Sequence, residues 1–492
     1  MKRLLCLLTL LLLPLHVLAA DNSHHMIAYT GDENALNWNE NQFFQRMEAQ
    51  TGLHFEITQY NGKGDYRTAL SQLGEGNAPT DLVFNAGLAS HELEALYQQG
   101  KILDLSPYIE RCMPNLNALL KEHDEIRERI TVNGRILSLP HINFCPPQNY
   151  MWINKNWLDA LKLNIPNNSE ELAAVLRAFK TQDPNRNGQQ DEIPLSFMGI
   201  WDLNVLSHGF GIIADDFHLY EESGVHFAPM EDKYYTFIAY LRMLYAEGLL
   251  DKDGFSPLIK LSADEKTPKI NKYGILIAPT PFQSLPKALG EEYILLPPLV
   301  YEDRAVYRRL IDIAIPGALL VTSQAKNAEQ LLSWADYLYS EEGGKLLTIG
   351  KEGEEYKRFE DGTWDWIDGS PDNLKRILAE STLNIKGFLP YLEPFDFQKK
   401  FDDTSARSIL EQIEHFTQYL VSPMPYVYLN AEEAAKIQAL HQPLGKYTDE
   451  TLSRFILDEI ALNDDSWQAY KNELKRLGVD KYIRFWQEKL SK

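Results

Sequence analysis

The chain has 492 residues, of which 44% are hydrophobic and 11% aromatic, so it is long enough for more than one packed domain. Its formal net charge of −22 argues against nucleic acid as a partner, because nucleic-acid binding needs clustered cations. The chain contains no Gly-x-Ser-x-Gly, His-Glu-x-x-His, P-loop or Gly-x-Gly-x-x-Gly sequence, which argues against the enzyme classes that use them.

The first twenty residues predict a secretory signal peptide. Lys2 and Arg3 form a positive start, a leucine-rich run follows, and small residues allow cleavage near Ala19 or Ala20. An uncleaved anchor is the alternative, but the apolar run is short for a membrane span and polar residues follow at once. Cys6 lies too early for a lipid-attachment cysteine. We therefore expect an exported, periplasmic protein without a lipid anchor.

The segment after the signal alternates predicted strands and helices. Strands are predicted at 26–31, 54–60 and 81–87, and helices at 39–52, 65–76, 91–100 and from Ser106 onward. This alternation is typical of a parallel sheet with helices on both faces. Ligands of such sheets bind beyond the carboxyl ends of the strands, so the turns at Asp32–Trp38 and Asn85–Gly87 are candidate binding surfaces.

A proline-rich kink at 140–147 is a candidate crossover between domains. Beyond it, residues 167–181 predict an amphipathic helix that begins at Asn168, with Glu171 placed for a capping box. The remaining pattern predicts a helix at 235–250, a buried strand at 272–279, strand then helix at 307–344, and a mostly helical last quarter in which Gly478 ends the helix 464–478. Because no flexible linker separates the halves, we expect two domains joined by several short crossings.

The stretch "DPNRNGQQDE" at 183–192 has the start of a calcium-binding loop. An EF-hand would place a bidentate glutamate at the twelfth position, but this chain has Pro194 there. A shorter loop could close its coordination earlier, and Gly188 would permit the sharp turn. A solvated turn is the alternative reading. The added acids at the end favour a structural Ca²⁺ held by Asp183, Asn185, Asn187, the carbonyl of Gln189, Asp191 and Glu192.

The chain is rich in aromatic residues, with 9 Trp, 25 Tyr and 21 Phe. Sugar rings stack on aromatic side chains, and their hydroxyls pair with amides and carboxylates. For each aromatic, burial in a core is the alternative. Cys112 and Cys145 could pair in an oxidising compartment, and the sequence leaves this open. The candidate ligand-binding residues are Trp38, Asn85, Tyr150, Trp152, Trp201 and Phe282.

Five blocks, in order along the chain, resemble one family. They are "LYQQGKILDLSPYIERCMPN", "NGRILSLP", "MWINKNWLDALKLNIPNNSEELAAVLRAFKTQDPNRNGQQDEIPLSF", "GALLVTSQAKNAEQLLSWADYLYSEEGGKLLTIGKEGEEY" and "FILDEIALNDDSWQAYKNELKRLGVDKYI". The chain resembles the extracellular solute-binding proteins (family 1) of ABC importers, in the large branch that includes alginate-binding proteins. Asn154 stands where many relatives carry arginine, and the chain lacks a lipid-attachment cysteine.

The resemblance implies an α/β, two-lobed periplasmic-binding-protein fold (type II) with a ligand cleft between the lobes. It also implies a calcium site on the six loop residues already named. We expect a monomeric binding protein, not an enzyme, that captures an oligosaccharide and delivers it to a membrane permease. The alternatives are a secreted glycan-cleaving enzyme and a sensor that presents its ligand to a receptor kinase. Alginate and neutral sugars remain equally open.

The expected domain boundaries follow from the same pattern. Residues 1–20 form the signal peptide. The N-lobe comprises 21–140 plus about 308–349, and the C-lobe comprises 141–307 plus about 350–492, with a helical C-terminal region.

Overall fold

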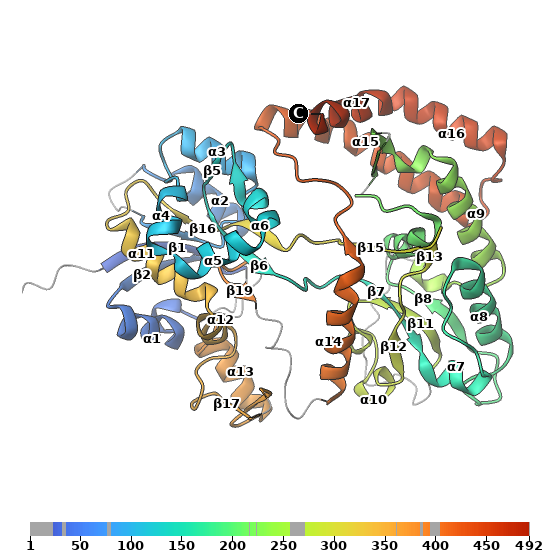
Figure 1. Cartoon of the computed structure of the whole chain (residues 1–492), viewed down its shortest axis with the longest axis horizontal. Helices are drawn as coiled ribbons and strands as arrows, with labels where there is room; N and C mark the ends of the chain where they lie inside the picture. The colour runs from blue at the N-terminus through green and yellow to red at the C-terminus, as the bar shows by residue number, and fades with distance from the viewer. Residues whose placement is uncertain are drawn as a thin grey trace, which may run out of the picture.

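The computed structural model describes residues 23–491, except 32–35, 76–79, 216, 223, 256–270, 361, 384–386 and 394–403. It forms two α/β lobes that lie side by side (Figure 1). The predicted signal peptide lies outside the described residues. Within them, no helix has the length and apolar character needed to cross a membrane. Cys112 and Cys145 are both half-buried free thiols.

The first lobe is built on a six-stranded sheet with the strand order β19-β6-β16-β3-β1-β2. Strand β1 pairs in parallel with β2 and β3, as predicted. Strand β16 runs antiparallel to both β3 and β6, so the sheet is mixed rather than wholly parallel. The reason is that β16 returns from the second lobe and enters this sheet from the opposite end. The strands are β1 (Ser23–Tyr29), β2 (His54–Tyr60), β3 (Leu82–Phe84), β6 (Leu139–Asn143), β16 (Ala314–Val321) and β19 (Leu392–Glu393).

Helices flank this sheet where the sequence places capping residues. The side chain of Asn41 accepts a hydrogen bond from the Phe43 amide at the start of α1, and Gly52 ends that helix with a φ of 71°. The first lobe contains α1 (Gln42–Thr51), α2 (Lys63–Ser71), α3 (Ser90–Gln98), α4 (Ser106–Cys112), α5 (Pro114–Glu122), α6 (Asp124–Ile130), α11 (Ala328–Asp336) and α12 (Glu341–Thr348).

The second lobe has a four-stranded sheet with the order β12-β7-β11-β8. Helix α8 begins as predicted, because Asn168 accepts a hydrogen bond from the Glu171 amide. The C-terminal helices α15, α16 and α17 cross one end of this lobe (Figure 1). The elements are β7 (Tyr150–Asn154), β8 (Ile193–Ser196), β11 (Tyr273–Ala278), β12 (Tyr293–Leu295), α7 (Lys155–Leu161), α8 (Ser169–Thr181), α9 (Asp232–Ala246), α14 (Thr404–Phe416), α15 (Ala431–Ile456), α16 (Asp464–Leu477) and α17 (Val479–Leu490).

The segment 350–393 packs with the first lobe, which corrects the expected start of the last C-lobe segment near residue 350. Strand β19 pairs with β6, and Leu383, Leu389 and Tyr391 are buried in the first lobe's core. These apolar side chains cover an edge of the first sheet that would otherwise face water. The segment also contains the hairpin β17 (Tyr356–Arg358) and β18 (Trp364–Trp366), and α13 (Pro371–Glu380). Residues 404–491 pack mainly on the second lobe, where α14 contacts β12, and α15 contacts α9.

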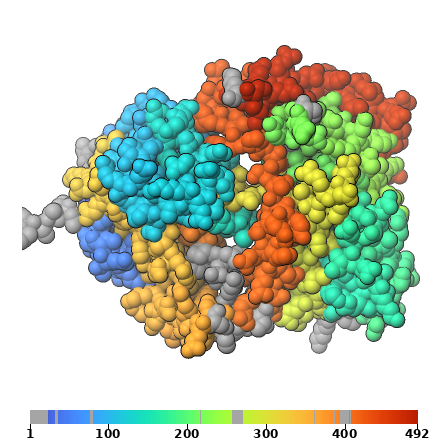
Figure 2. Space-filling view, in the orientation of Figure 1, coloured from blue at the N-terminus to red at the C-terminus, as the bar shows by residue number. Residues whose placement is uncertain are grey.

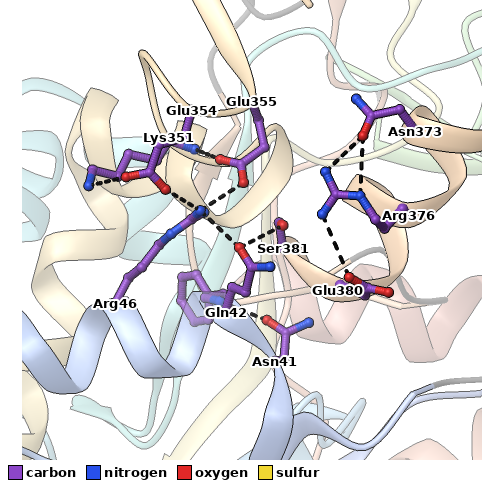
Figure 3. A network of polar contacts seen from close by, with 11 residues as sticks. Asn41, Gln42, Arg46, Lys351, Glu354, Glu355, Asn373, Arg376, Glu380 and Ser381 are labelled. Atoms are coloured by element: carbon purple, nitrogen blue, oxygen red, sulfur yellow. Dashed lines mark hydrogen bonds and ion pairs between the residues drawn. The ribbon is translucent and has the colours of Figure 1, made fainter. Parts of the chain in front are cut away.

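A polar network fastens this segment to α1 (Figure 3). Arg46 of α1 contacts the carboxylates of both Glu354 and Glu355 at 2.7 Å. The Ser381 hydroxyl donates to Gln42 at 3.1 Å. The side chains of Arg46 and Glu355 are only 16% and 6% exposed, so their ion pair is shielded from water.

Replacing Arg46 with methionine should destabilise the protein by about 2–3 kcal/mol, because it leaves the Glu355 carboxylate buried without its cation. Arg376→Met is the matched control, since its pair with Glu380 is solvent-exposed and should contribute less than about 0.5 kcal/mol. Urea unfolding of both variants measures the difference. Equal losses would contradict the anchoring role of Arg46.

Candidate functional site

Within the described part of the chain, crossings at residues 144–149 and 309–313 connect the lobes, and they are hydrogen-bonded to each other. Gln148, which is 2% exposed, accepts a hydrogen bond from the Leu310 amide at 2.9 Å and donates to the Arg308 carbonyl at 3.3 Å. The Tyr307 hydroxyl donates to the Asn149 carbonyl at 2.9 Å. The crossings therefore form one connected floor between the lobes.

Gln148→Ala should destabilise the protein by about 1–2 kcal/mol, because it removes a buried side-chain amide that bonds a part-buried backbone N–H and a part-buried backbone carbonyl. Gln283→Ala, at an exposed position, is the control and should be nearly neutral. Thermal unfolding compares the two. A Gln148→Ala protein as stable as the control would contradict the connection between the crossings.

A pocket of about 250 Å³ lies on the second-lobe side of this floor. Trp201 lines it with a side chain that is 49% exposed, on the 3₁₀ helix η2 (Ile200–Phe210). Beside it, the Asp202 carboxylate accepts hydrogen bonds from the Asn149 amide (2.5 Å) and from the backbone of Met198 and Gly199 (2.8 and 3.1 Å). Burial raises the pKa of Asp202. The pocket thus combines an open aromatic face with fixed polar groups.

His208 lines the same pocket and is almost fully buried. Its ring packs against that of Tyr307 with centroids 4.3 Å apart, and its Nδ1 has no hydrogen-bond partner. Burial, together with the nearby Arg308 guanidinium, lowers the pKa of His208 to about 3. His208 is therefore neutral at physiological pH, and its Nδ1 is a buried ring nitrogen without a hydrogen bond beside the pocket.

A second pocket, of about 290 Å³, lies on the first-lobe side of the same crossings. Phe388, 41% exposed, lines it, and its ring contacts that of His141 with centroids 5.4 Å apart. Asn143 donates to the Glu393 carboxylate at 2.9 Å. Burial lowers the pKa of His141 to about 4 and raises that of Glu393. The crossing residues Pro146, Pro147, Ile311 and Asp312 also line it, so the two pockets are lined by neighbouring residues of the same crossings.

The two pockets form one candidate cleft with a wall on each lobe. Each wall carries one exposed aromatic ring, Trp201 on the second lobe and Phe388 on the first. Figure 2 shows hollows between the lobes alongside the orange segment that includes α14. We define the cleft as the described lining of these two pockets.

Trp201 is the one predicted ligand-binding residue that lines the cleft. Trp38, Tyr150 and Trp152 are 3%, 1% and 0% exposed, so their assignment to the ligand site is wrong. Trp38 packs in the core of the first lobe. Tyr150 and Trp152 lie on β7, which has a neighbouring strand on each side and is buried throughout. A buried ring has no free face to stack on a sugar.

Asn85 and Phe282 also lie outside the cleft lining. Asn85 is 4% exposed, accepts a hydrogen bond from the Phe388 amide at 3.1 Å and donates to the Tyr29 carbonyl at 2.9 Å. It therefore positions the loop that carries Phe388. Phe282 is half-buried against the core of the second lobe. The candidate surface 32–38 falls partly on residues outside those described.

Sequence reasoning missed the first-lobe wall, namely Phe388, His141, Asn143 and Glu393. Phe388 follows a glycine and precedes "LP", a context that favours an irregular, exposed aromatic position. That signal was available, but the segment had been assigned to the other lobe.

The predicted calcium loop directly follows α8 and turns sharply. Asp183 and Gly188 both adopt positive φ, at 46° and 73°. The Asp183 carboxylate accepts hydrogen bonds from the amides of Asn187 and Gly188, both at 3.0 Å, and the Asn185 side chain also accepts from the Asn187 amide. The side-chain oxygens at alternate positions therefore turn inward over the loop backbone.

Two acidic residues close the loop. The Asp191 carboxylate pairs with Lys272 at 2.6 Å and accepts a hydrogen bond from the side-chain amide of Asn187 at 2.9 Å. These contacts lower the pKa of Asp191. Oε1 of Glu192 is buried without a hydrogen-bond partner. Burial and the charges of Asp183 and Asp191 raise the pKa of Glu192. The loop thus contains an unpaired carboxylate oxygen of Glu192 near the charges of Asp183 and Asp191.

No family model matches the chain. The sequence is 27% identical over 483 residues to the fructooligosaccharide ABC transporter substrate-binding protein FusA of Streptococcus pneumoniae, covering 92% of this chain and 86% of that protein. A structure of a FusA EF-hand mutant in complex with fructo-nystose superposes with a TM-score of 0.66 at 24% identity, covering 95% of this chain and 98% of FusA.

A second solved structure has a more similar overall shape. An extracellular solute-binding protein from Bifidobacterium longum subsp. infantis superposes with a TM-score of 0.77 at 22% identity, covering 95% of this chain and 97% of that protein. These relatives are binding proteins of ABC importers rather than enzymes. The chain is similar to an ABC-transporter substrate-binding protein over nearly its whole length and has the two-lobed α/β fold of these solved structures.

Proposed function

We propose that this protein captures an oligosaccharide in the cleft between its lobes and delivers it to the permease of an ABC importer. The observation that carries the proposal is the pairing of two exposed aromatic rings, Trp201 and Phe388, on opposite walls of one cleft. Amphipathic sugar rings stack on such faces, while the side-chain amides of Asn149 and Asn204 lie in the lining to pair with hydroxyls.

The hydrogen-bonded crossings act as the hinge about which the lobes close on the ligand. Rotation of the lobes about the Gln148 floor would bring the two walls onto the ligand and exclude water. The named relative FusA is a fructooligosaccharide-binding protein, which supports a glycan ligand. We propose that the mature protein acts as a monomer in the periplasm, free of a lipid anchor, with the permease subunits as its protein partners.

Isothermal titration calorimetry against a panel of oligosaccharides tests the proposal, with small-angle scattering of the same samples. We expect dissociation constants in the micromolar range or below and a smaller radius of gyration on binding, because closure compacts the lobes. Binding of non-sugar ligands alone would refute the glycan assignment.

We also propose that the loop at 183–192 binds a structural Ca²⁺. The residues that would hold the ion are Asp183, Asn185, Asn187, Gln189 through its carbonyl, Asp191 and Glu192. The unpaired Glu192 oxygen and the oxygen-rich donor set support this proposal. The EF-hand mutant of FusA indicates that a relative has a site of this kind. Bound calcium would neutralise the loop's acids and fix the segment between α8 and β8.

A further inference from the structure

The charges that line the cleft bear on the chemical class of the glycan, and this inference rests on the proposed function. Among the described lining residues, Arg308 is the one permanently charged cation. The lining carboxylates are Asp202 in the second-lobe pocket and Asp312 and Glu393 in the first-lobe pocket. Because Asp312 is paired with Arg129, an acidic ligand would meet the carboxylates of Asp202 and Glu393 and the single cation of Arg308.

Arg308 is already engaged within the protein. Its guanidinium donates to the Ala214 carbonyl at 2.7 Å, and the Asp202 carboxylate lines the same pocket. The second-lobe pocket therefore presents one cation and one carboxylate, and so no net positive charge, in its described lining. A sugar carboxylate loses its hydration when it enters a cleft. A bidentate interaction with a guanidinium that has free N–H groups is the usual means of offsetting that free-energy cost.

The first-lobe pocket contains no cation in its described lining. Asp312 is paired with Arg129 of α6, whereas Glu393 contacts Asn143 and lies 3.6 Å from His141. Burial lowers the pKa of His141 to about 4, and that of His208 on the opposite wall to about 3. Both imidazoles are neutral at pH 7 and add no positive charge to the cleft.

The uncharged polar groups suit hydroxyls. The lining includes the half-buried side-chain amides of Asn149 and Asn204, together with the neutral imidazole of His208. Amides and neutral imidazoles offer both donors and acceptors, as sugar hydroxyls do, whereas a carboxylate only accepts. The whole chain carries a net charge of −22, which adds a long-range repulsion of polyanions.

We propose that the cleft selects neutral oligosaccharides and excludes uronic-acid oligosaccharides. The aromatic rings bind the apolar faces of the sugar, the amides bind its hydroxyls, and the Glu393 carboxylate of the first-lobe wall repels acidic ligands.

Calorimetry with matched ligand pairs tests this selection. Each pair consists of an oligouronate and the same oligosaccharide after its carboxyl groups are reduced to alcohols, and neutral oligosaccharides of other linkages complete the panel. We expect every ligand that binds to be neutral, with a dissociation constant that changes less than about twofold between 50 and 500 mM NaCl. An oligouronate that binds at least tenfold tighter than its reduced partner would overturn the selection. If no glycan of either kind binds, the proposed function itself fails.

A variant tests the electrostatic cause. Glu393→Gln removes a charge but keeps a hydrogen-bond acceptor for Asn143, and it should raise oligouronate affinity at least threefold relative to the reduced partner. Glu352→Gln, an exposed residue outside the cleft lining, is the matched control and should leave that ratio unchanged. An unchanged ratio in Glu393→Gln would overturn the role of this carboxylate.

Discussion

Replacing Trp201 with alanine is expected to weaken oligosaccharide binding by about 2 kcal/mol, or roughly 30-fold in the dissociation constant. The ring is half exposed on the cleft wall, and its loss would remove an apolar face from the sugar without emptying a core. Phe388→Ala should cause a loss of similar size on the opposite wall. Calorimetry with a ligand identified from the glycan panel measures both.

The double variant gives a sharper result than either single change. If one ligand contacts both walls in the closed protein, the binding free energy lost in the double variant should differ from the sum of the two single losses. The reason is that removal of one ring weakens the contact of the ligand with the other ring. Tyr220→Ala is the control, since Tyr220 is 42% exposed and aromatic but does not line the cleft. Retention of full affinity in Trp201→Ala would place the ligand elsewhere.

Local sequence signals predicted the elements well because those signals act over one or two turns. The Asn168 cap with its Glu171 bond and the left-handed Gly478 at the end of α16 are confirmed. Each depends on a residue type that satisfies a helix end or tolerates positive φ, whatever the rest of the fold does. The alternation of strands and helices at the N-terminus likewise predicted the parallel pairing of β1 with β2 and β3.

Long-range placement could not be obtained in the same way. Strand β19 is two residues long, and its pairing with β6 joins positions about 250 residues apart. A segment this short has no periodicity that distinguishes one sheet edge from another. The assignment of residues 350–393 therefore followed chain order, and Phe388 was missed with them.

The aromatic candidates show a related limit. Trp152 and Trp201 are the same residue type, yet one is fully buried on β7 and the other is half exposed on η2. The run "YMWIN" has four apolar residues in succession, which is typical of a strand covered on both faces and indicates burial of Tyr150 and Trp152, against their prediction as ligand-binding residues. Exposure of Trp201 depends on where the lobes meet, which composition does not encode.

Removal of calcium with EDTA is expected to lower the melting temperature by about 10 °C. At a Ca²⁺ concentration 1,000-fold above the dissociation constant, binding stabilises the fold by about 4 kcal/mol, and each kcal/mol corresponds to a few degrees in a lobe of this size. Asp183→Asn should abolish the response to calcium, because it removes a charge from the donor set while keeping an acceptor oxygen for one of the two backbone amides, Asn187 or Gly188. Scanning calorimetry with and without EDTA measures both effects.

The stabilisation by calcium should also depend on pH in a defined direction. The pKa of Glu192 is raised, so on acidification from pH 7 this carboxyl takes up a proton before an ordinary glutamate would. Calcium needs the ionised form, and its stabilising effect should shrink as the pH falls toward that raised pKa. In calcium-free protein, acidification has the opposite effect at Glu192: protonation stabilises the fold there, because it relieves the cost of a buried charge.

Asp159→Ala, at an exposed helix position, is the control and should keep the full response to calcium. A wild-type melting temperature unchanged by EDTA would refute the calcium site.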